Sequence, residues 1–164
     1  MAKALSTLSI VVGLISDTHG LLRPEIPRIF SGVDLIVHAG DVGGGHVLEA
    51  LGKIAAVEAV SGNVDDRSNP MLPRQRSLPV GKLILHVSHG DELGHPTPER
   101  LLARYAGAIL VYGHTHTPLV FRDDHGRLVV NPGAAGPRRF KLEPTVARLS
   151  VVDQTPDVEL ITLT

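Results

Sequence analysis

Hydrophobic residues along the chain form short continuous runs that alternate with amphipathic stretches. Continuous apolar runs of this length are typical of buried strands. Buried strands are therefore expected at 8–16, 34–40, 55–62 and 108–113. Helical spacing, early prolines and a Thr-Pro-Glu start predict helices between them. These are expected at 23–32, 44–54 and 97–107.

The remaining segments favour β-hairpins. Residues 75–80 and 82–90 flank a Gly-Lys turn, and 119–133 folds back around Asp-Asp-His-Gly. Two further strands are expected at 145–153 and 157–164. Alternating strands and helices followed by hairpins predict an α/β fold with a mixed sheet or two packed sheets. We expect one domain over 1–164.

Composition disfavours some partners and excludes cysteine-based sites. The chain has 164 residues, 43% of them hydrophobic, and its 16 Lys+Arg against 17 Asp+Glu give a net charge of −1. This balance does not favour duplex DNA or an anionic membrane as partner. There are no cysteines, so thiolate ligands and disulfides are excluded. The stretch 1–16 is too short and too β-branched for a signal peptide, and we expect a cytoplasmic protein without a membrane span.

Polar residues follow five successive predicted strands, and a glycine lies beside them each time. In open α/β sheets, ligands bind beyond the carboxyl ends of the strands. Glycine allows the backbone to turn sharply and to approach a ligand closely. The polar set comprises Asp17, His19, Asp41, Asn63, Asp65, Asp66, His89, Asp91, His114 and His116.

Each strand end has an ordinary reading when it is taken alone. Asp17 and His19 could be surface loop residues, Asp41 a turn or helix cap, and Asn63 a left-handed turn residue. His114 and His116 could also be loop residues. Together, however, these acidic and imidazole groups would share one crevice without a neighbouring Lys or Arg. Oxygen and nitrogen donors in such a cluster indicate a metal site, with two ions as the preferred number.

The order of these motifs resembles the calcineurin-like metallophosphoesterase superfamily, and within it the small YfcE-type phosphodiesterases. The resemblance spans residues 10 to about 137 and includes the Asn-Pro-Gly segment at 131–133. It implies a four-layer αββα sandwich, in which helices flank two packed mixed β-sheets. It also implies a phosphoesterase, more readily a phosphodiesterase than a phosphomonoesterase, acting on a small-molecule phosphate ester.

The resemblance further implies a ligand set and a mechanism. One metal would take Asp17, His19 and His116, the other Asn63, His89 and His114, and Asp41 would bridge the two. Asp41, Asn63 and His114 would also be catalytic. The expected ions are two divalent metals, Mn²⁺ first, with Fe, Zn²⁺ or Ni²⁺ as alternatives. A metal-bridging hydroxide would attack phosphorus in line.

Two positions depart from the family pattern. Val64 stands where many relatives carry a histidine that protonates the leaving group, which predicts faster hydrolysis of aryl than of alkyl phosphodiesters. Asp91 stands where relatives often have a second histidine near the substrate, so the sequence does not name the substrate. Neither the native metal nor the oligomeric state follows from the sequence, although the β-rich C-terminal part could form the edge of a homo-oligomer.

Other polar residues receive weaker assignments. Arg138 and Arg139 follow a glycine-rich corner and could contact the substrate phosphate or lie on the surface. Asp65 could orient a ligand histidine or serve a turn. His38 and His86 lie within apolar strands, so a core or supporting role is expected. No role is assigned to Thr115.

Two other functions compete with the phosphodiesterase. A nuclease is disfavoured because the sequence lacks a basic, aromatic groove for nucleic acid. A non-catalytic scaffold is the second alternative, since the retromer subunit with this fold has lost part of its ligand set and binds proteins. Completeness of the ligand set in this chain favours the enzyme.

Overall fold

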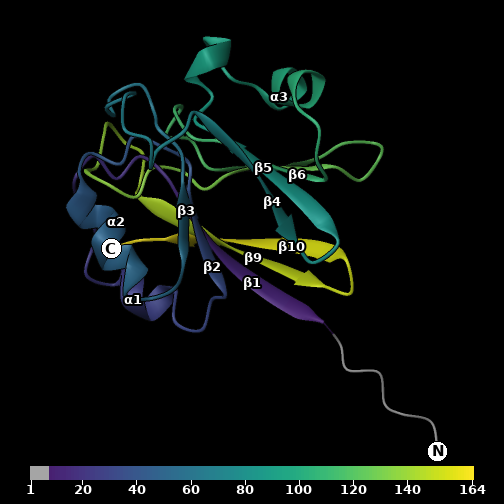
Figure 1. Ribbon diagram of the computed structural model, residues 1–164, viewed down its shortest axis with the longest axis horizontal. Helices are drawn as coiled ribbons and strands as arrows, with labels where there is room; N and C mark the ends of the chain where they lie inside the picture. Colours follow the sequence, from purple (N-terminus) through teal and green to yellow (C-terminus); the bar gives the residue numbers. More distant parts are fainter. Residues whose placement is uncertain (1–7) are drawn as a thin grey trace, which may run out of the picture.

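A computed structural model describes residues 8–164, so the first part of the rejected signal-peptide stretch lies outside the described residues. The chain folds into two five-stranded sheets packed face to face, with helices outside them (Figure 1). Both sheets mix parallel and antiparallel neighbours, as expected. None of the helices within this part of the chain has the length and hydropathy that a membrane span requires.

The first sheet has the order β10-β9-β1-β2-β3. Its central strand β1 pairs parallel with β2 and antiparallel with β9, and β2 pairs parallel with β3. β9 and β10 form a tight hairpin whose turn residues, Asp153 and Gln154, both have positive φ as a type I′ turn requires. The strands are β1 (Ser9–Ile15), β2 (Leu35–His38), β3 (Val57–Ala59), β9 (Thr145–Val152) and β10 (Thr155–Thr162).

The second sheet has the order β4-β5-β6-β8-β7. Its parallel centre, β5-β6-β8, is flanked by the two predicted hairpins, β4-β5 and β7-β8. The strands are β4 (Gln75–Val80), β5 (Leu83–Ser88), β6 (Ile109–Val111), β7 (Leu119–Arg122) and β8 (Leu128–Asn131). The three parallel strands of each sheet end near one another, and the predicted ligands follow β1, β2 and β3 of the first sheet and β5 and β6 of the second.

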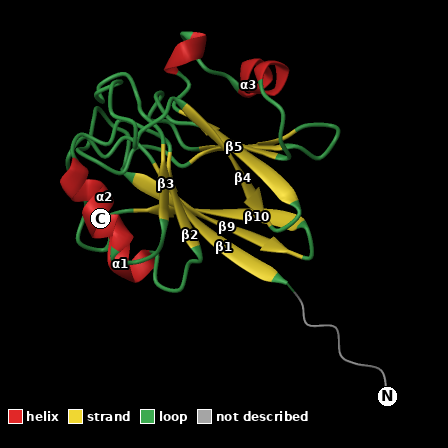
Figure 2. Cartoon of the chain, viewed as in Figure 1, coloured by secondary structure: helices red, strands yellow, loops and turns green. Residues whose placement is uncertain are grey.

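Helices cover the outer faces thinly (Figure 2). α1 (Ile26–Ile29) and α2 (Gly45–Gly52) pack on the first sheet, and α3 (Pro98–Arg104) with the 3₁₀ turn η1 (Asp91–Leu93) packs on the second. The predicted ten-residue helix at 23–32 is only one turn long. Its N-cap, Glu25, makes no side-chain capping bond, and Gly32 just beyond it has left-handed φ.

The core is almost entirely aliphatic, as the scarcity of aromatic residues requires. Between the sheets, Val12, Leu14, Val37, Leu85 and Val130 are fully buried. A second cluster fills the space between the first sheet and its helices. The four-layer αββα arrangement is therefore confirmed, with its two sheets as the thick central layers.

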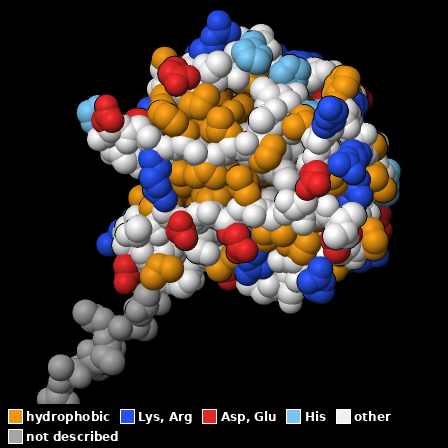
Figure 3. All heavy atoms as spheres, turned by 180° about the vertical axis from the view of Figure 1, so that it is seen from behind, with side chains coloured by type: hydrophobic (Ala, Val, Ile, Leu, Met, Phe, Trp, Pro, Cys, Tyr) orange, Lys and Arg blue, Asp and Glu red, His pale blue; other side chains and the backbone are white. Residues whose placement is uncertain are grey.

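Hydrophobic side chains also reach the surface. Figure 3 shows them gathered in patches on the face seen from behind. Ile84, Val120 and Val152 are each more than 40% exposed. Such patches can serve as contact surfaces between proteins, and the homo-oligomer considered for this chain stays a prediction.

Candidate metal centre

The predicted ligands come from five strand ends, three in the first sheet and two in the second. Backbone hydrogen bonds fix these ends to one another. The amide of Asp17 donates to the carbonyl of Gly40, and the amide of Gly113 donates to the carbonyl of His89, each at 3.0 Å. The second of these bonds joins the ends of β5 and β6. The corners after the strands are therefore held as one assembly before any side chain is considered.

Five of the seven predicted ligands have left-handed backbone conformations. Their φ angles lie between 45° and 69°, a region that disfavours residues with a Cβ. Such conformations cluster at functional sites because the surrounding structure must hold them in place. They are Asp17, His19, Asp41, His114 and His116.

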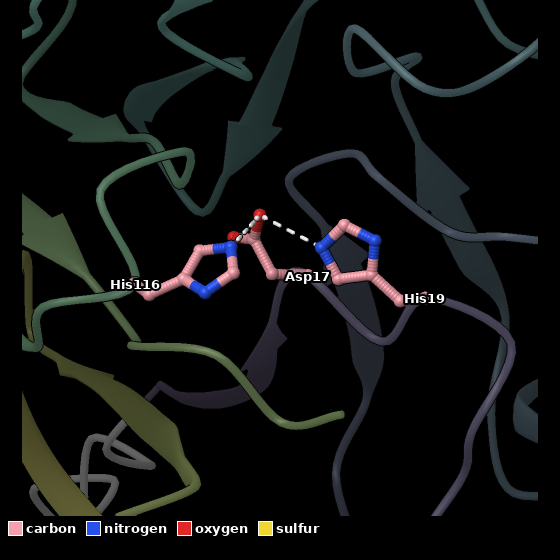
Figure 4. Close-up of side chains that lie close together, drawn as sticks. All are labelled: Asp17, His19 and His116. Atoms are coloured by element: carbon pink, nitrogen blue, oxygen red, sulfur yellow. Dashed lines mark ion pairs between the residues drawn. The ribbon is translucent and has the colours of Figure 1, made fainter. Parts of the chain in front are cut away.

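Asp17 lies at the centre of the cluster and is fully buried. Its Oδ1 lies 3.2 Å from Nε2 of His116 and 3.8 Å from Nε2 of His19, so the two rings flank the carboxylate (Figure 4). Its Oδ2 accepts hydrogen bonds from the Ser16 hydroxyl at 2.6 Å and from the His114 amide at 3.2 Å. Asp17, His19 and His116 thus present three donor atoms within 4.8 Å of one another.

Asp41 and His89 extend the cluster on the other side of Asp17. Nε2 of His89 lies 3.2 Å from Oδ2 of Asp41, and Nε2 of His19 lies 3.7 Å from the same oxygen. The other carboxylate oxygen of Asp41 accepts a hydrogen bond from the amide of Val64. Asp41 therefore lies between His19 and His89, and Asp17, Asp41 and His89 form a second group of three close donors.

Asn63 and His114 complete the cluster. Oδ1 of Asn63 lies 3.2 Å from Nδ1 of His114, and the His114 ring stands edge-on to the His89 ring with centroids 5.2 Å apart. A continuous series of contacts therefore joins all seven predicted ligands. Asn63 is exposed and meets the cluster through His114, whereas Asp17 and His89 are fully buried.

The pKa shifts of Asp17 and His89 reflect the lack of positive charge around the buried carboxylates. Burial raises the pKa of Asp17, but the His116 ring, the charge of His89 and the Ser16 hydroxyl together hold it below its usual 3.8. Burial disfavours the charged form of His89, yet the Asp41 and Asp17 carboxylates outweigh it and raise its pKa to about 9. Two buried carboxylates so close together require a cation, either a proton on His89 or a metal ion.

Buried atoms without hydrogen-bond partners test whether a metal fits. Within residues 8–164, Oδ1 of Asp17, Nε2 of His19 and Nε2 of His89 are buried and have no hydrogen-bond partner. His89 uses its other ring nitrogen, Nδ1, to contact the carbonyl of Ala39 at 2.8 Å, which fixes the ring so that Nε2 would offer its lone pair once a metal replaces the proton. Unpaired carboxylate and imidazole atoms that converge in this way match the donors of a divalent transition metal.

His38 supports the site from behind, as expected for a histidine within a strand. Its Nδ1 accepts a hydrogen bond from the amide of Gly40, so Nε2 carries the ring proton and contacts the Thr18 hydroxyl at 2.9 Å. That hydroxyl donates to the carbonyl of Val42. Burial lowers the pKa of His38 to about 4, so the ring is neutral. This relay ties the corner after β1 to the corner after β2.

Asp65 was expected either to orient a ligand histidine or to serve a turn, and its hydrogen bonds match the turn. The carboxylate accepts bonds from the amides of Val42, Gly43 and Gly62 at 2.9–3.1 Å. It joins the corners after β2 and β3, and so positions Asp41 and Asn63 through the backbone.

The two arginines both line a small hollow with His116, and each also lines a separate one. Arg139 lines a hollow beside His114 and His116, and its charge adds to burial in lowering the pKa of His19 against the pull of the carboxylates. Arg138 also lines a hollow with Arg23, the last residue of β10 and the two residues that follow it. Arg139 is thus the arginine whose charge acts on the cluster.

Asn131 and Thr115 are positioning residues that the sequence did not identify. The fully buried Asn131 amide nitrogen donates to the carbonyl of Gly113 and to the Thr115 hydroxyl, at 3.1 and 2.9 Å. These bonds hold the corner that carries His114 and His116. The Asn-Pro-Gly segment was the available signal, because a buried asparagine at the end of a strand must find partners.

Comparisons with known proteins agree with this geometry. Residues 10–154 match the calcineurin-like phosphoesterase superfamily domain. A probable metallophosphoesterase of Methanocaldococcus jannaschii is 38% identical over 156 residues, which cover 89% of this chain and 78% of the relative. Phosphodiesterase YfcE of Escherichia coli is 34% identical over 146 residues, which cover 73% of this chain and 76% of that protein.

Solved structures show the same fold. Vacuolar protein sorting 29 from Cryptosporidium parvum superposes with a TM-score of 0.78 over 95% of this chain and 98% of that one. The two sequences are 22% identical. This likeness concerns the arrangement of the sheets and helices.

Proposed function

Because the chain belongs to the calcineurin-like phosphoesterase superfamily, we propose that it hydrolyses phosphodiesters with two divalent metal ions held by the seven-residue cluster. The observation that carries this proposal is the convergence of buried, partnerless donor atoms from Asp17, His19 and His89. A protein-interaction scaffold has no need of such atoms, because each buried polar group without a partner destabilises the fold.

The geometry supports a particular division of the ligands. Asp17, His19 and His116 would hold one ion, since their donor atoms form one close group. Asn63, His89 and His114 would hold the other, with Asp41 shared, because its Oδ2 faces both His19 and His89. Carboxylate, amide and imidazole donors without thiolate suit Mn²⁺, with Fe, Zn²⁺ or Ni²⁺ as alternatives.

The residues of this chain would hold the metal ions and orient the groups that bind them. Bound divalent ions supply positive charge to phosphate oxygens and lower the pKa of water toward neutrality. Asp17 is aimed by Ser16, His89 by the carbonyl of Ala39, and Asp41 by the Val64 amide. The Arg139 guanidinium would add charge for the phosphate from the rim of the hollow.

The substrate preference follows from Val64. This half-exposed aliphatic side chain follows Asn63 and offers no proton to a leaving group. Loss of a general acid costs about 10²–10⁴-fold when the leaving group is a poor one. We therefore expect aryl phosphodiesters to turn over faster than alkyl phosphodiesters when chemistry limits the rate.

Hydrolysis of bis(p-nitrophenyl) phosphate and of p-nitrophenyl phosphate, each with Mn²⁺ and with EDTA, tests the proposal. We expect metal-dependent turnover that is faster on the diester, lost in His114→Ala, and retained in the control His125→Ala, which changes an exposed histidine of the β7-β8 turn. No turnover of either ester with any divalent metal, together with no metal in elemental analysis, would favour the scaffold.

A further inference from the structure

Phe140 is the most exposed of the large hydrophobic side chains that reach the surface of the described chain. Its side chain is 94% exposed, whereas Phe30 is fully buried in the core and Phe121 is 37% exposed on β7. Exposed hydrophobic residues scattered singly are common and need no function. The position of Phe140 relative to the metal centre is what distinguishes it.

Phe140 lines the same hollow as two proposed ligands. This hollow has a volume of about 210 Å³, and its walls include His114, His116, Arg139, Phe140 and Leu142. It therefore brings together imidazoles from the metal centre, a guanidinium and two apolar side chains. A phosphate group beside the imidazoles would place its organic substituent toward Phe140 and Leu142.

The segment that carries Phe140 is fixed to the metal centre at its base. The amide of Ala135 donates to the carbonyl of Ser16, and the amide of Gly136 donates to the carbonyl of Asp17. A Cβ on Gly136 would lie 2.3 Å from the carbonyl oxygen of Thr18, so glycine permits this close approach. The position of the turn is thus set by the same backbone that positions Asp17.

Both the backbone conformation of Phe140 and the exposure of its ring are energetically unfavourable. Phe140 has a φ of +55°, which is costly for a bulky residue, and the amide of Leu142 donates to the carbonyl of Arg139 to close the turn. Neither the exposure of the ring nor its backbone conformation stabilises the folded chain. A ligand that covers the ring would account for both features.

We propose that Phe140, together with Leu142 and Arg139 of the same hollow, binds an aromatic ester group of the phosphodiester substrate. The ring of Phe140 offers a face for stacking, and Arg139 offers hydrogen bonds to a phosphate oxygen. This inference rests on the proposed function and specifies its substrate class: phosphodiesters with at least one aryl or heteroaryl substituent.

Phosphinates provide the test, since their two P–C bonds resist hydrolysis and their single negative charge matches that of a diester. Methylphenylphosphinate differs from dimethylphosphinate only in carrying a phenyl group in place of one methyl group. Calorimetric titration of the Mn²⁺-loaded protein should give tighter binding of the phenyl compound. Phe140→Ala should weaken that binding about two- to twelvefold, the range for one aromatic pair, and leave dimethylphosphinate unchanged.

Two further variants separate recognition from folding. Phe140→Trp should retain the preference for the phenyl compound because it retains an aromatic face, and the control Phe121→Ala should behave as the wild type. Equal loss of both phosphinates in Phe140→Ala, or a wild type without preference for the phenyl compound, would overturn the inference. Failure of the proposed function is seen separately, as absence of metal-dependent hydrolysis of bis(p-nitrophenyl) phosphate.

Discussion

The buried ring of His38 makes the stability of the metal-free protein depend on pH in a way that can be calculated. The ring is fully buried and makes hydrogen bonds through both nitrogens, to Gly40 and Thr18. Burial lowers its pKa from 6.5 to about 4. In the unfolded chain the ring is exposed and binds a proton near pH 6.5. As the pH falls below 6.5, protonation therefore favours the unfolded chain first.

The size of the effect follows from the difference in pKa. One pKa unit corresponds to about 1.4 kcal/mol, so a change from 6.5 to about 4 corresponds to about 3 kcal/mol. His38 contributes this stability fully above pH 6.5. The contribution is lost as the pH falls through the window from 6.5 to 4. Its steepest slope is one proton, or about 1.4 kcal/mol per pH unit.

Urea unfolding in EDTA at several pH values between 4 and 7.5 measures this directly. The variant His38→Gln keeps a polar side chain but cannot titrate. It should be less stable than the wild type at pH 7.5, and the difference in unfolding free energy should shrink by about 3 kcal/mol by pH 4. His125→Gln, at an exposed position, is the control for the loss of one histidine.

Parallel stability curves for the wild type and His38→Gln would refute the reasoning. An NMR titration of the His38 ring in the folded wild type provides a second check that does not depend on the variant. A ring that titrates near pH 6.5 would show that burial does not hold it neutral.

Four further substitutions test the corner after β6 and its ligands. Gly113→Ala places a Cβ 2.1 Å from the Ser16 hydroxyl, so urea unfolding should show a loss of about 1–3 kcal/mol and elemental analysis a lower metal content. Asn131→Ala leaves the buried amide of Gly133 without its acceptor, which should cost about 1–3 kcal/mol of unfolding free energy. His116→Ala and His114→Ala should each deplete a different metal ion, measured as the metal-to-protein ratio; full loading of either variant would contradict the ligand division.

Much of the fold could be predicted from the sequence because its strands are continuous apolar runs with polar or glycine-rich ends. The hairpin around 123–126 was predicted from its turn residues, and β7 and β8 confirm it. Helix lengths were less predictable. Pro24 and Gly32 marked the region of α1, but only the packing of Ile26 and Phe30 against the first sheet decides how many residues are helical.

The sequence predicted the site only as a set of residue types at strand ends. The left-handed conformations of Asp17 and His116 could not be predicted, because local propensity would assign glycine to such positions. Arg139 was also hard to place, since its charge acts on His19 from 120 residues away in the chain. Contacts between distant segments determine these features, and no local pattern encodes them.

The left-handed corners that carry the proposed ligands place folding and function in conflict. Glycine would adopt these conformations without the cost of about 1 kcal/mol or more that a Cβ imposes. Selection for thermal stability alone therefore does not protect these positions, because a substitution that relieves the backbone can also remove a ligand. Stabilisation of this chain by directed evolution needs a selection for metal binding in every round.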